Sequence, residues 1–252
     1  MKRALLRPLI VTAGLLAAWQ LLVAVTGVPR YILPGPLRIA AVFVTHWQTL
    51  AHHAGITLVE IVLGLILGTV LGAGCALTMT ASRSVKRWLL PLLVMSQAVP
   101  VFALAPLLIL WLGYGMGSKV TMAVLIIFFP VTAAFYDGLR RTDPEWLELA
   151  RVMDAPPRAV LTHIRLPAAL PAFASGLRVA TAVAPIGAIV GEWVGSSAGL
   201  GFYMLHANAR MQTDLMFAAL ALVVAMALAL YFSVDRGLKR LVYWQTEEEQ
   251  EL

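Results

Sequence analysis

The sequence predicts an all-α integral membrane protein with six transmembrane helices, built as a single transmembrane domain over residues 1–252. Its composition is the first reason, since 60% of the residues are hydrophobic and only 13% are charged, against about 45–50% and about 25% in soluble domains. The second is a series of long apolar runs, because a hydrocarbon core of about 30 Å needs about 20 helical residues. The six runs cover 9–25, 56–79, 88–112, 120–138, 170–194 and 215–232. A helix satisfies its own backbone hydrogen bonds, which lipid cannot do, so helices are expected rather than strands.

The first run needs separate justification because it follows Lys2, Arg3 and Arg7, which is also how a cleavable signal peptide begins. Its apolar stretch is longer than a usual signal core, and no Ala-x-Ala site follows. We therefore expect a retained first helix.

Basic residues indicate the orientation of these spans. Of the 19 lysines and arginines, 14 fall on one set of alternating connections and ends, and Arg178 falls inside the fifth span. The remaining four are Arg30, Arg38, Lys119 and Arg210. Because cytoplasmic connections are enriched in Lys and Arg, both termini and the connection 139–169 are predicted to be cytoplasmic.

That connection carries signals for two short helices. Thr142 and Glu145 have capping-box spacing, and Asp143 followed by Pro144 fits an N-cap and first helical position, so a helix is expected over about 144–153. A second helix is expected over about 155–165, capped by Asp154 and stopped by Pro167. The first of these helices has an apolar strip too short to span a membrane. Such a strip is buried either against its own bundle or against another protein. It comprises Trp146, Leu147, Leu149, Ala150 and Val152.

A segment within the same connection, ELARVMDAPPRAVLTHIRLP (148–167), resembles the cytoplasmic signature of permease subunits of binding-protein-dependent ABC importers. That signature reads Glu-Ala-Ala, three residues, Gly, nine residues, Ile-x-Leu-Pro. Leu149 departs from the first Ala and Asp154 departs from the Gly. The matching positions are Glu148, Ala150, Ile164, Leu166 and Pro167.

The resemblance extends over most of the chain. YILPGPLRIAA near residue 31, TLVEIVLGLILGTVLG near 57, PVFALAPLLILWLGYG near 100 and VGEWVGSSAGLGFYM near 190 look like the nitrate, sulfonate and taurine branch. The tail from 190 to 220 resembles permeases of the thiamin pyrimidine precursor. Asp tolerates a left-handed backbone better than most residues and caps helices, so its place at the motif glycine need not abolish the turn.

The resemblance implies a type I ABC importer permease fold in which the loop 139–169 forms a coupling helix. The implied partners are two copies of an ATPase subunit that carries ATP and Mg, an extracytoplasmic substrate-binding protein, a second copy of this chain, and the lipid of the bacterial inner membrane. No nucleic acid partner is expected. The implied ATPase-coupling residues are Glu148, Ala150, Asp154, Ala155, Ile164, Leu166 and Pro167.

Polar residues within the spans are candidates for the translocation pathway, because their desolvation is costly. Glu192 and Trp193 close the fifth span, where they either touch substrate or the outer gate, or hydrogen-bond to the following glycine-rich turn. Ser96 and Gln97, ahead of Pro100, either contact substrate or make interhelical hydrogen bonds.

Glu60 and Arg178 are the two charged residues inside predicted spans that need a partner. Glu60 either reaches the headgroups or serves transport. Arg178 either reaches the interface, lines the cavity or pairs with Asp137, and we favour the pairing.

Glycines and prolines suggest how the spans pack. Gly64, Gly68 and Gly72 repeat every four residues, which predicts close helix packing within one subunit. The repeat of Gly187, Gly191, Gly195 and Gly199 runs into a loop and predicts turns and bending. Kinks are expected at Pro91, Pro100, Pro106 and Pro185.

No catalytic residue, bound cofactor or metal site is expected in this chain. The nearest approach to a P-loop, 113–119, has Ser118 before Lys119 and follows a helix rather than a strand. His46, His52 and His53 fit a solvated amphipathic helix on the outer surface better than a metal site. The alternative function is an ion-coupled secondary transporter, which the lack of mid-membrane carboxylates disfavours.

Overall fold

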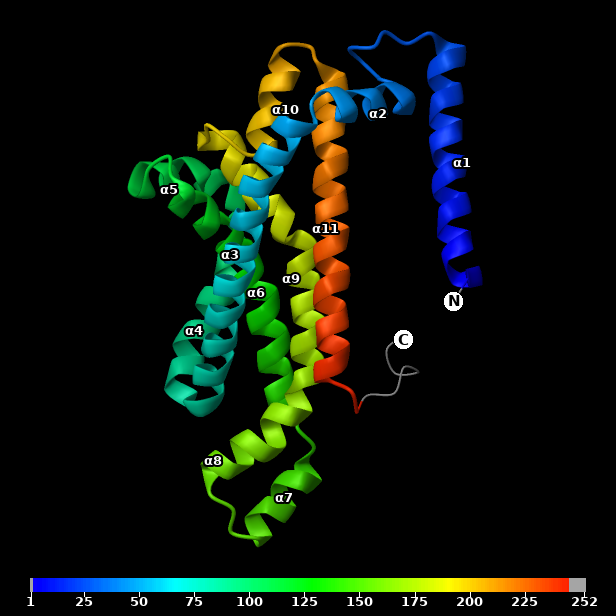
Figure 1. The fold of residues 1–252 in the computed structure, drawn as a ribbon. Coiled ribbons are helices and arrows are strands. Elements are labelled where there is room, and N and C mark those ends of the chain that lie inside the picture. The colour runs from blue at the N-terminus through cyan, green and yellow to red at the C-terminus, as the bar shows by residue number, and fades with distance from the viewer. Residues whose placement is uncertain (1, 245–252) are drawn as a thin grey trace. The chain divides into compact units, whose positions relative to one another are not determined.

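A computed structural model describes residues 2–244, with side chains from Ile10 onward, and every regular element among them is a helix (Figure 1). In chain order the helices are α1 (Lys2–Thr26), α2 (Pro36–Thr45), α3 (Trp47–Ala81), α4 (Arg83–Ser96), η1 (Val101–Leu104), α5 (Ala105–Leu112), α6 (Met116–Arg140), α7 (Pro144–Val152), α8 (Pro157–Ala159), η2 (Val160–Arg165), α9 (Leu166–Gly195), α10 (Leu200–Ala209) and α11 (Thr213–Leu241).

The chain forms two compact units, whose boundaries fall inside α3 and α11. Among the described residues, the first unit comprises 2–57 and 197–225, and the second comprises 58–196 and 226–244.

Within residues 2–244, four helices are long and apolar enough to cross a membrane. They are α3, α6, the continuous run Pro157–Gly195 and α11, and they contain four of the predicted spans, 56–79, 120–138, 170–194 and 215–232. The first predicted span begins at Leu9, whose side chain lies outside the described residues. Its described part, Ile10–Thr26, is a shorter apolar helix.

The third predicted span, 88–112, is not a single helix. Its two halves, Arg83–Ser96 and Val101–Leu112, meet at a bend of 93°. The break falls at Pro100, whose backbone is extended, because proline disfavours helical backbone at the residue before it. Pro91 lies inside α4 without ending it, and Pro106 lies in the first turn of α5, where a missing N–H costs no helical hydrogen bond. Of the kinks predicted in this region, the one at Pro100 therefore breaks the span.

In the second unit α3 packs on α6 through its glycines, as the four-residue repeat predicted. A Cβ added to Gly68 would lie 2.7 Å from the Cγ2 of Ile127, and one added to Gly72 would lie 3.0 Å from the carbonyl oxygen of Phe128. Around this seam lies an apolar core that includes the fully buried Ile127. Small residues let the two backbones approach this closely.

The glycines of α9 correct the prediction made for them. Gly187, Gly191 and Gly195 lie within the helix rather than in a turn, and a Cβ added to Gly187 would lie 2.6 Å from the Cα of Ala123 in α6. Only Gly199 occupies the predicted turn, with φ +111°. Helix α6 is thus packed at backbone distance against α3 and against α9.

In the first unit, side chains of the early turns of α3 hold the start of α10. The Nδ1 of His53 accepts a hydrogen bond from Gly199 N at 3.0 Å, and Thr57 Oγ1 accepts one from Leu200 N at 2.8 Å. These bonds satisfy N–H groups that a helix leaves unpaired at its start. The His53 ring also stacks on Tyr203, so this histidine is a packing residue and not, as predicted, a solvated one.

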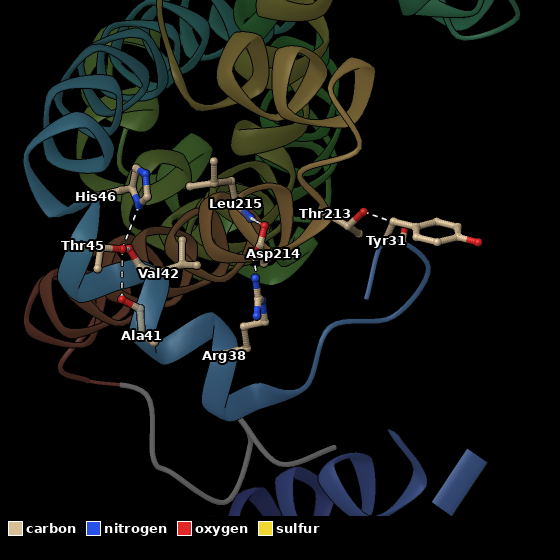
Figure 2. A network of polar contacts seen from close by, with 9 residues as sticks. All are labelled: Tyr31, Arg38, Ala41, Val42, Thr45, His46, Thr213, Asp214 and Leu215. Atoms are coloured by element: carbon tan, nitrogen blue, oxygen red, sulfur yellow. Dashed lines mark hydrogen bonds and ion pairs between the residues drawn. The ribbon is translucent and has the colours of Figure 1, made fainter. Parts of the chain in front are cut away.

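A second polar network in the first unit ties the start of α11 to α2 and the loop before it (Figure 2). Arg38 Nε donates to Asp214 Oδ2 at 3.0 Å, and Thr213 Oγ1 donates to the carbonyl oxygen of Tyr31 at 2.7 Å. Both contacts join segments more than 170 residues apart, which fixes α2 beside the start of α11.

Candidate functional site

The candidate site is the hairpin that joins α6 to α9, built from α7, a tight turn, α8 and η2. The predicted start of α7 is confirmed. The Asp143 side chain accepts a hydrogen bond from Glu145 N at 2.9 Å, and Pro144 occupies the first helical position. Thr142 is not the cap, because its hydroxyl donates to the carbonyl oxygen of Leu139 at the end of α6.

The turn after α7 places Asp154 in the left-handed region, with φ +52°. Ala155 N donates to the carbonyl oxygen of Ala150 at 2.9 Å, and Asp154 N donates to that of Arg151 at 3.0 Å. This pair of bonds is the Schellman arrangement, in which the left-handed position is usually glycine. The turn requires left-handed backbone at the position where the motif has glycine. Asp154 adopts this conformation at a cost in conformational free energy.

Asp154 does not, however, cap the second helix as predicted. The residue before α8 is Pro156, and it makes no side-chain capping bond. A residue that terminates α7 in left-handed backbone lies two positions too early to cap α8.

Pro167 does not stop the second helix either. Helices α8, η2 and α9 form one continuous run, and η2 is a π-helix in which Leu166 N donates to the carbonyl oxygen of Leu161. Proline cannot donate to the preceding turn, and a local π-bulge of this kind re-registers the hydrogen bonds without ending the helix. The second helix of the hairpin, formed by α8 and η2, therefore continues into α9 without a break.

Between α7 and the start of the α8–α9 run lies an apolar groove of about 470 Å³. Four of the seven predicted coupling residues line it, namely Ala150, Ala155, Ile164 and Pro167. Its other lining residues are Trp146, Leu149, Met153, Ala159, Val160, His163, Ala168 and Trp244. These four coupling residues thus lie on one continuous surface.

The remaining coupling residues, Glu148, Asp154 and Leu166, do not line this groove. Glu148 is exposed on α7, and Leu166 is half-buried at the start of α9. The apolar strip on α7 is only partly buried: Ala150 is 3% exposed, whereas Val152 is 85% exposed. Trp146 and Leu149 are exposed as well. Packing among the described residues buries Ala150 and half-buries Leu147, but it leaves Trp146, Leu149 and Val152 exposed.

The predicted pathway residues do not form one group in the described structure. Ser96 Oγ donates to the carbonyl oxygen of Leu93 at 2.7 Å, and Gln97 Nε2 donates to Ser96 Oγ at 3.3 Å, both exposed at the end of α4. These are contacts within one helix end and not the interhelical bonds considered above. Trp193 is exposed, whereas Glu192 beside it is buried.

Glu192 belongs to a buried cluster of charged residues from three helices. Glu60 of α3 is fully buried, and its Oε1 lies 3.1 Å from the Nζ of Lys119 in α6, whose side chain is 8% exposed. The Glu192 side chain interacts with the Glu60 carboxyl group, and Gly191 lies against the backbone of Lys119. The headgroup position considered for Glu60 is therefore not correct, because its carboxyl group is buried against Lys119. Sequence spacing gave no signal for this cluster, because its members lie 59 and 73 residues apart.

Arg178 is paired, as favoured, but with a different partner. Its Nε donates to Asp235 Oδ1 of α11 at 2.8 Å, whereas Asp137 lies 3.8 Å from Arg140 of its own helix. The ion pair joins the first half of α9 to α11 within the second unit.

Comparisons with known proteins agree with this geometry. Residues 61–243 match the family described as "Binding-protein-dependent transport system inner membrane component". A "Probable ABC transporter permease protein" of Haemophilus influenzae is 56% identical over 96% of this chain and 99% of its own length. The "Formylaminopyrimidine transport permease protein ThiX" of Halalkalibacterium halodurans is 35% identical over 96% of this chain and 97% of its own length.

A solved structure supports the fold. The chain resembles the crystal structure of an amino acid ABC transporter with a TM-score of 0.62 and 16% sequence identity, over 81% of this chain and 97% of that one. These similarities give no support to an ion-coupled secondary transporter. The chain therefore belongs to the binding-protein-dependent transport system inner membrane components, as the non-catalytic, multi-pass permease subunit of an ATP-driven ABC importer of the bacterial inner membrane, with ATP hydrolysis carried by a separate subunit.

Proposed function

We propose that the hairpin 141–165 is the coupling element of this permease and docks into a groove of the cytoplasmic ATPase subunit. The observation that carries the proposal is the apolar groove between α7 and the α8–α9 run, which gathers Ala150, Ala155, Ile164 and Pro167 on one surface. Exposed apolar side chains beside it, among them Val152 and Leu149, are typical of a surface that another protein covers.

The hairpin is joined to the bundle in a way suited to transmitting a displacement. At one end it continues from α6, and at the other it is one uninterrupted helical run with α9. Helices α6 and α9 in turn pack at backbone distance, for example where Gly176 meets the carbonyl oxygen of Pro130. ATP-driven closure of the ATPase dimer would push the hairpin, and rigid helices packed this closely would tilt together.

The proposed assembly has six spans per chain, with α1 as the first and the bent pair α4–α5 as the third, and with both termini in the cytoplasm. Two copies of the chain form the pathway, two ATPase copies bind their hairpins, and an extracytoplasmic binding protein delivers the solute. The asymmetric distribution of lysine and arginine supports this orientation.

For the solute we propose a small polar heterocycle of the formylaminopyrimidine type. Two observations support it: the relative with that name covers nearly the whole chain, and the segment 190–220 has the resemblance described above. Nitrate, alkanesulfonates and taurine are the competing solutes. A thermal-shift measurement on the partner binding protein, with pyrimidines, sulfonates, taurine and nitrate in parallel, decides between them.

The docking proposal is tested by reversing one charge on the hairpin. Glu148→Arg is expected to leave the permease inserted but to lower its co-purification with the ATPase and to abolish ATP-driven uptake. Glu145→Arg is the matched control, because Glu145 is also exposed on α7 but lies outside the motif. Deletion of 148–157 should reproduce the loss. Normal uptake by Glu148→Arg or by the deletion would rule out docking through this surface.

A further inference from the structure

The hairpin has a second hollow, which shares only Ala155 and Val160 with the docking groove. This basic groove has a volume of about 510 Å³ and lies between the end of α3, α7 and the α8–η2 segment. Its polar and apolar lining includes Thr80, Leu147, Arg151, Arg158 and Arg165. All of these residues belong to the second unit.

Charge is unbalanced in the basic groove. Three of its ten lining residues are arginines, and none is acidic. The ion pairs found among the described residues involve Arg38, Lys119, Arg140, Arg178 and Lys239, so none of the three groove arginines has a carboxylate partner there. Three guanidinium groups around one hollow, with no counter-charge from residues 2–244, favour an anionic ligand.

Arg165 adds a separate observation. Its Nε is buried and has no hydrogen-bond partner in the described part of the chain. A buried donor left unpaired costs about 1–3 kcal/mol, more when the group is charged, so such atoms are uncommon in folded proteins. An anion in the basic groove would offset the uncompensated charge of this guanidinium group.

The end of α3 indicates at which level of the membrane the basic groove lies. Ala81 is both the last residue of this spanning helix and part of the groove lining. A hollow at the end of a membrane span lies at the level of the lipid headgroups rather than in the hydrocarbon core. In the orientation proposed above it opens on the cytoplasmic side, where anionic lipid headgroups bind basic pockets.

We propose that the groove formed by Arg151, Arg158 and Arg165 beside the end of α3 binds the phosphate of an anionic phospholipid headgroup. The planar guanidinium group offers paired N–H donors that match phosphate oxygens, and the apolar wall at Leu147 and Ala81 suits the glycerol backbone. A lipid held there would fasten the hairpin to the end of α3. This inference rests on the proposed cytoplasmic orientation but not on the docking of the ATPase.

The test is lipid retention by the purified full-length permease in detergent, measured by native mass spectrometry. The probes are dioleoyl phosphatidylglycerol, tetraoleoyl cardiolipin and dioleoyl phosphatidylcholine, and inorganic phosphate forms a separate arm. Loss of one arginine near the surface is expected to weaken retention of the two anionic lipids about fivefold. The variants are Arg165→Gln and, because Arg158 is exposed and its replacement spares the fold, Arg158→Gln. Arg240→Gln is the matched control, being an exposed arginine outside the basic groove.

Retention of both anionic lipids over phosphatidylcholine, weakened in Arg165→Gln and Arg158→Gln but not in Arg240→Gln, supports the proposal. Equal retention by all three variants, or equal binding of phosphatidylcholine, overturns it. Saturable binding of inorganic phosphate without lipid retention overturns the assignment to lipid. Arginine variants that lose the ATPase yet keep the lipid would assign the basic groove to the ATPase interface. Glu148→Arg should keep its lipid, which separates failure of this inference from failure of the docking proposal.

Discussion

Substitutions at Asp154 should change the stability of the turn after α7 according to the backbone freedom of the new residue. With φ +52°, this position carries a left-handed penalty of about 1–2 kcal/mol for an ordinary L-residue, and somewhat less for Asp. A carboxylate at the end of α7 also opposes the helix dipole by about 0.3 kcal/mol. Glycine removes both terms but loses about 0.5–1 kcal/mol of chain entropy.

The expected order of turn stability is therefore Gly and Asn slightly above Asp, with Leu and Val below it. Asp154→Asn keeps tolerance for the left-handed region and removes the charge. Asp154→Val should weaken the turn by about 1–2 kcal/mol, because a β-branched side chain is least compatible with positive φ. Asn is thus expected to preserve the turn for a backbone reason, and not because Asp154 caps α8.

Amide hydrogen exchange over 150–160 measures this directly, because Ala155 N closes the turn on the carbonyl oxygen of Ala150. A loss of about 1.4 kcal/mol in Asp154→Val corresponds to about tenfold faster exchange by local opening. Thr162→Leu is the control, since it places a bulky side chain at an exposed site in helical backbone. Equal exchange in the Gly, Asn and Val variants would refute the argument that left-handed backbone governs this turn.

Three further predictions concern the packing of the second unit. Lys119→Met leaves buried carboxylates without their cation and should destabilise the permease in detergent by about 3 kcal/mol, whereas an unchanged unfolding midpoint would mean the cluster is not formed. Gly187→Ala must push α9 away from the α6 backbone and should cost about 1–3 kcal/mol; Gly74→Ala, where a Cβ meets open space, is the control and should be neutral or stabilising. Arg178→Met and Asp235→Asn break one ion pair at 2.8 Å, so their effects on the melting temperature should be less than additive in the double variant, and full additivity would contradict the pairing.

Much of the fold follows from local sequence. Runs of about 20 apolar residues can be stable in lipid only as helices, which is why the spans in α3, α6, α9 and α11 were predictable. The start of α7 was equally local, because Asp143 and Pro144 act on backbone groups two or three residues away. The motif 148–167 located the hairpin, and three of its five matching positions, Ala150, Ile164 and Pro167, line the groove beside α7.

Tertiary structure decided what depends on residues distant in the chain. A kink at Pro100 was predicted locally from the proline, but the 93° angle that divides this span into two helices was not, since both halves are apolar. The repeat of Gly187, Gly191 and Gly195 predicted a turn, whereas these residues lie in α9. Their role depends on α6, whose backbone packs against Gly187 and Gly191. Glu60, Lys119 and Glu192 each have an unremarkable local context, and only the close approach of three helices brings them together. Sequence determined which segments are helical and apolar because those properties come from neighbouring residues. The pairing of buried charges required the fold, because a charge inside a membrane protein is stabilised by whichever distant helix brings its counter-charge within about 3–4 Å.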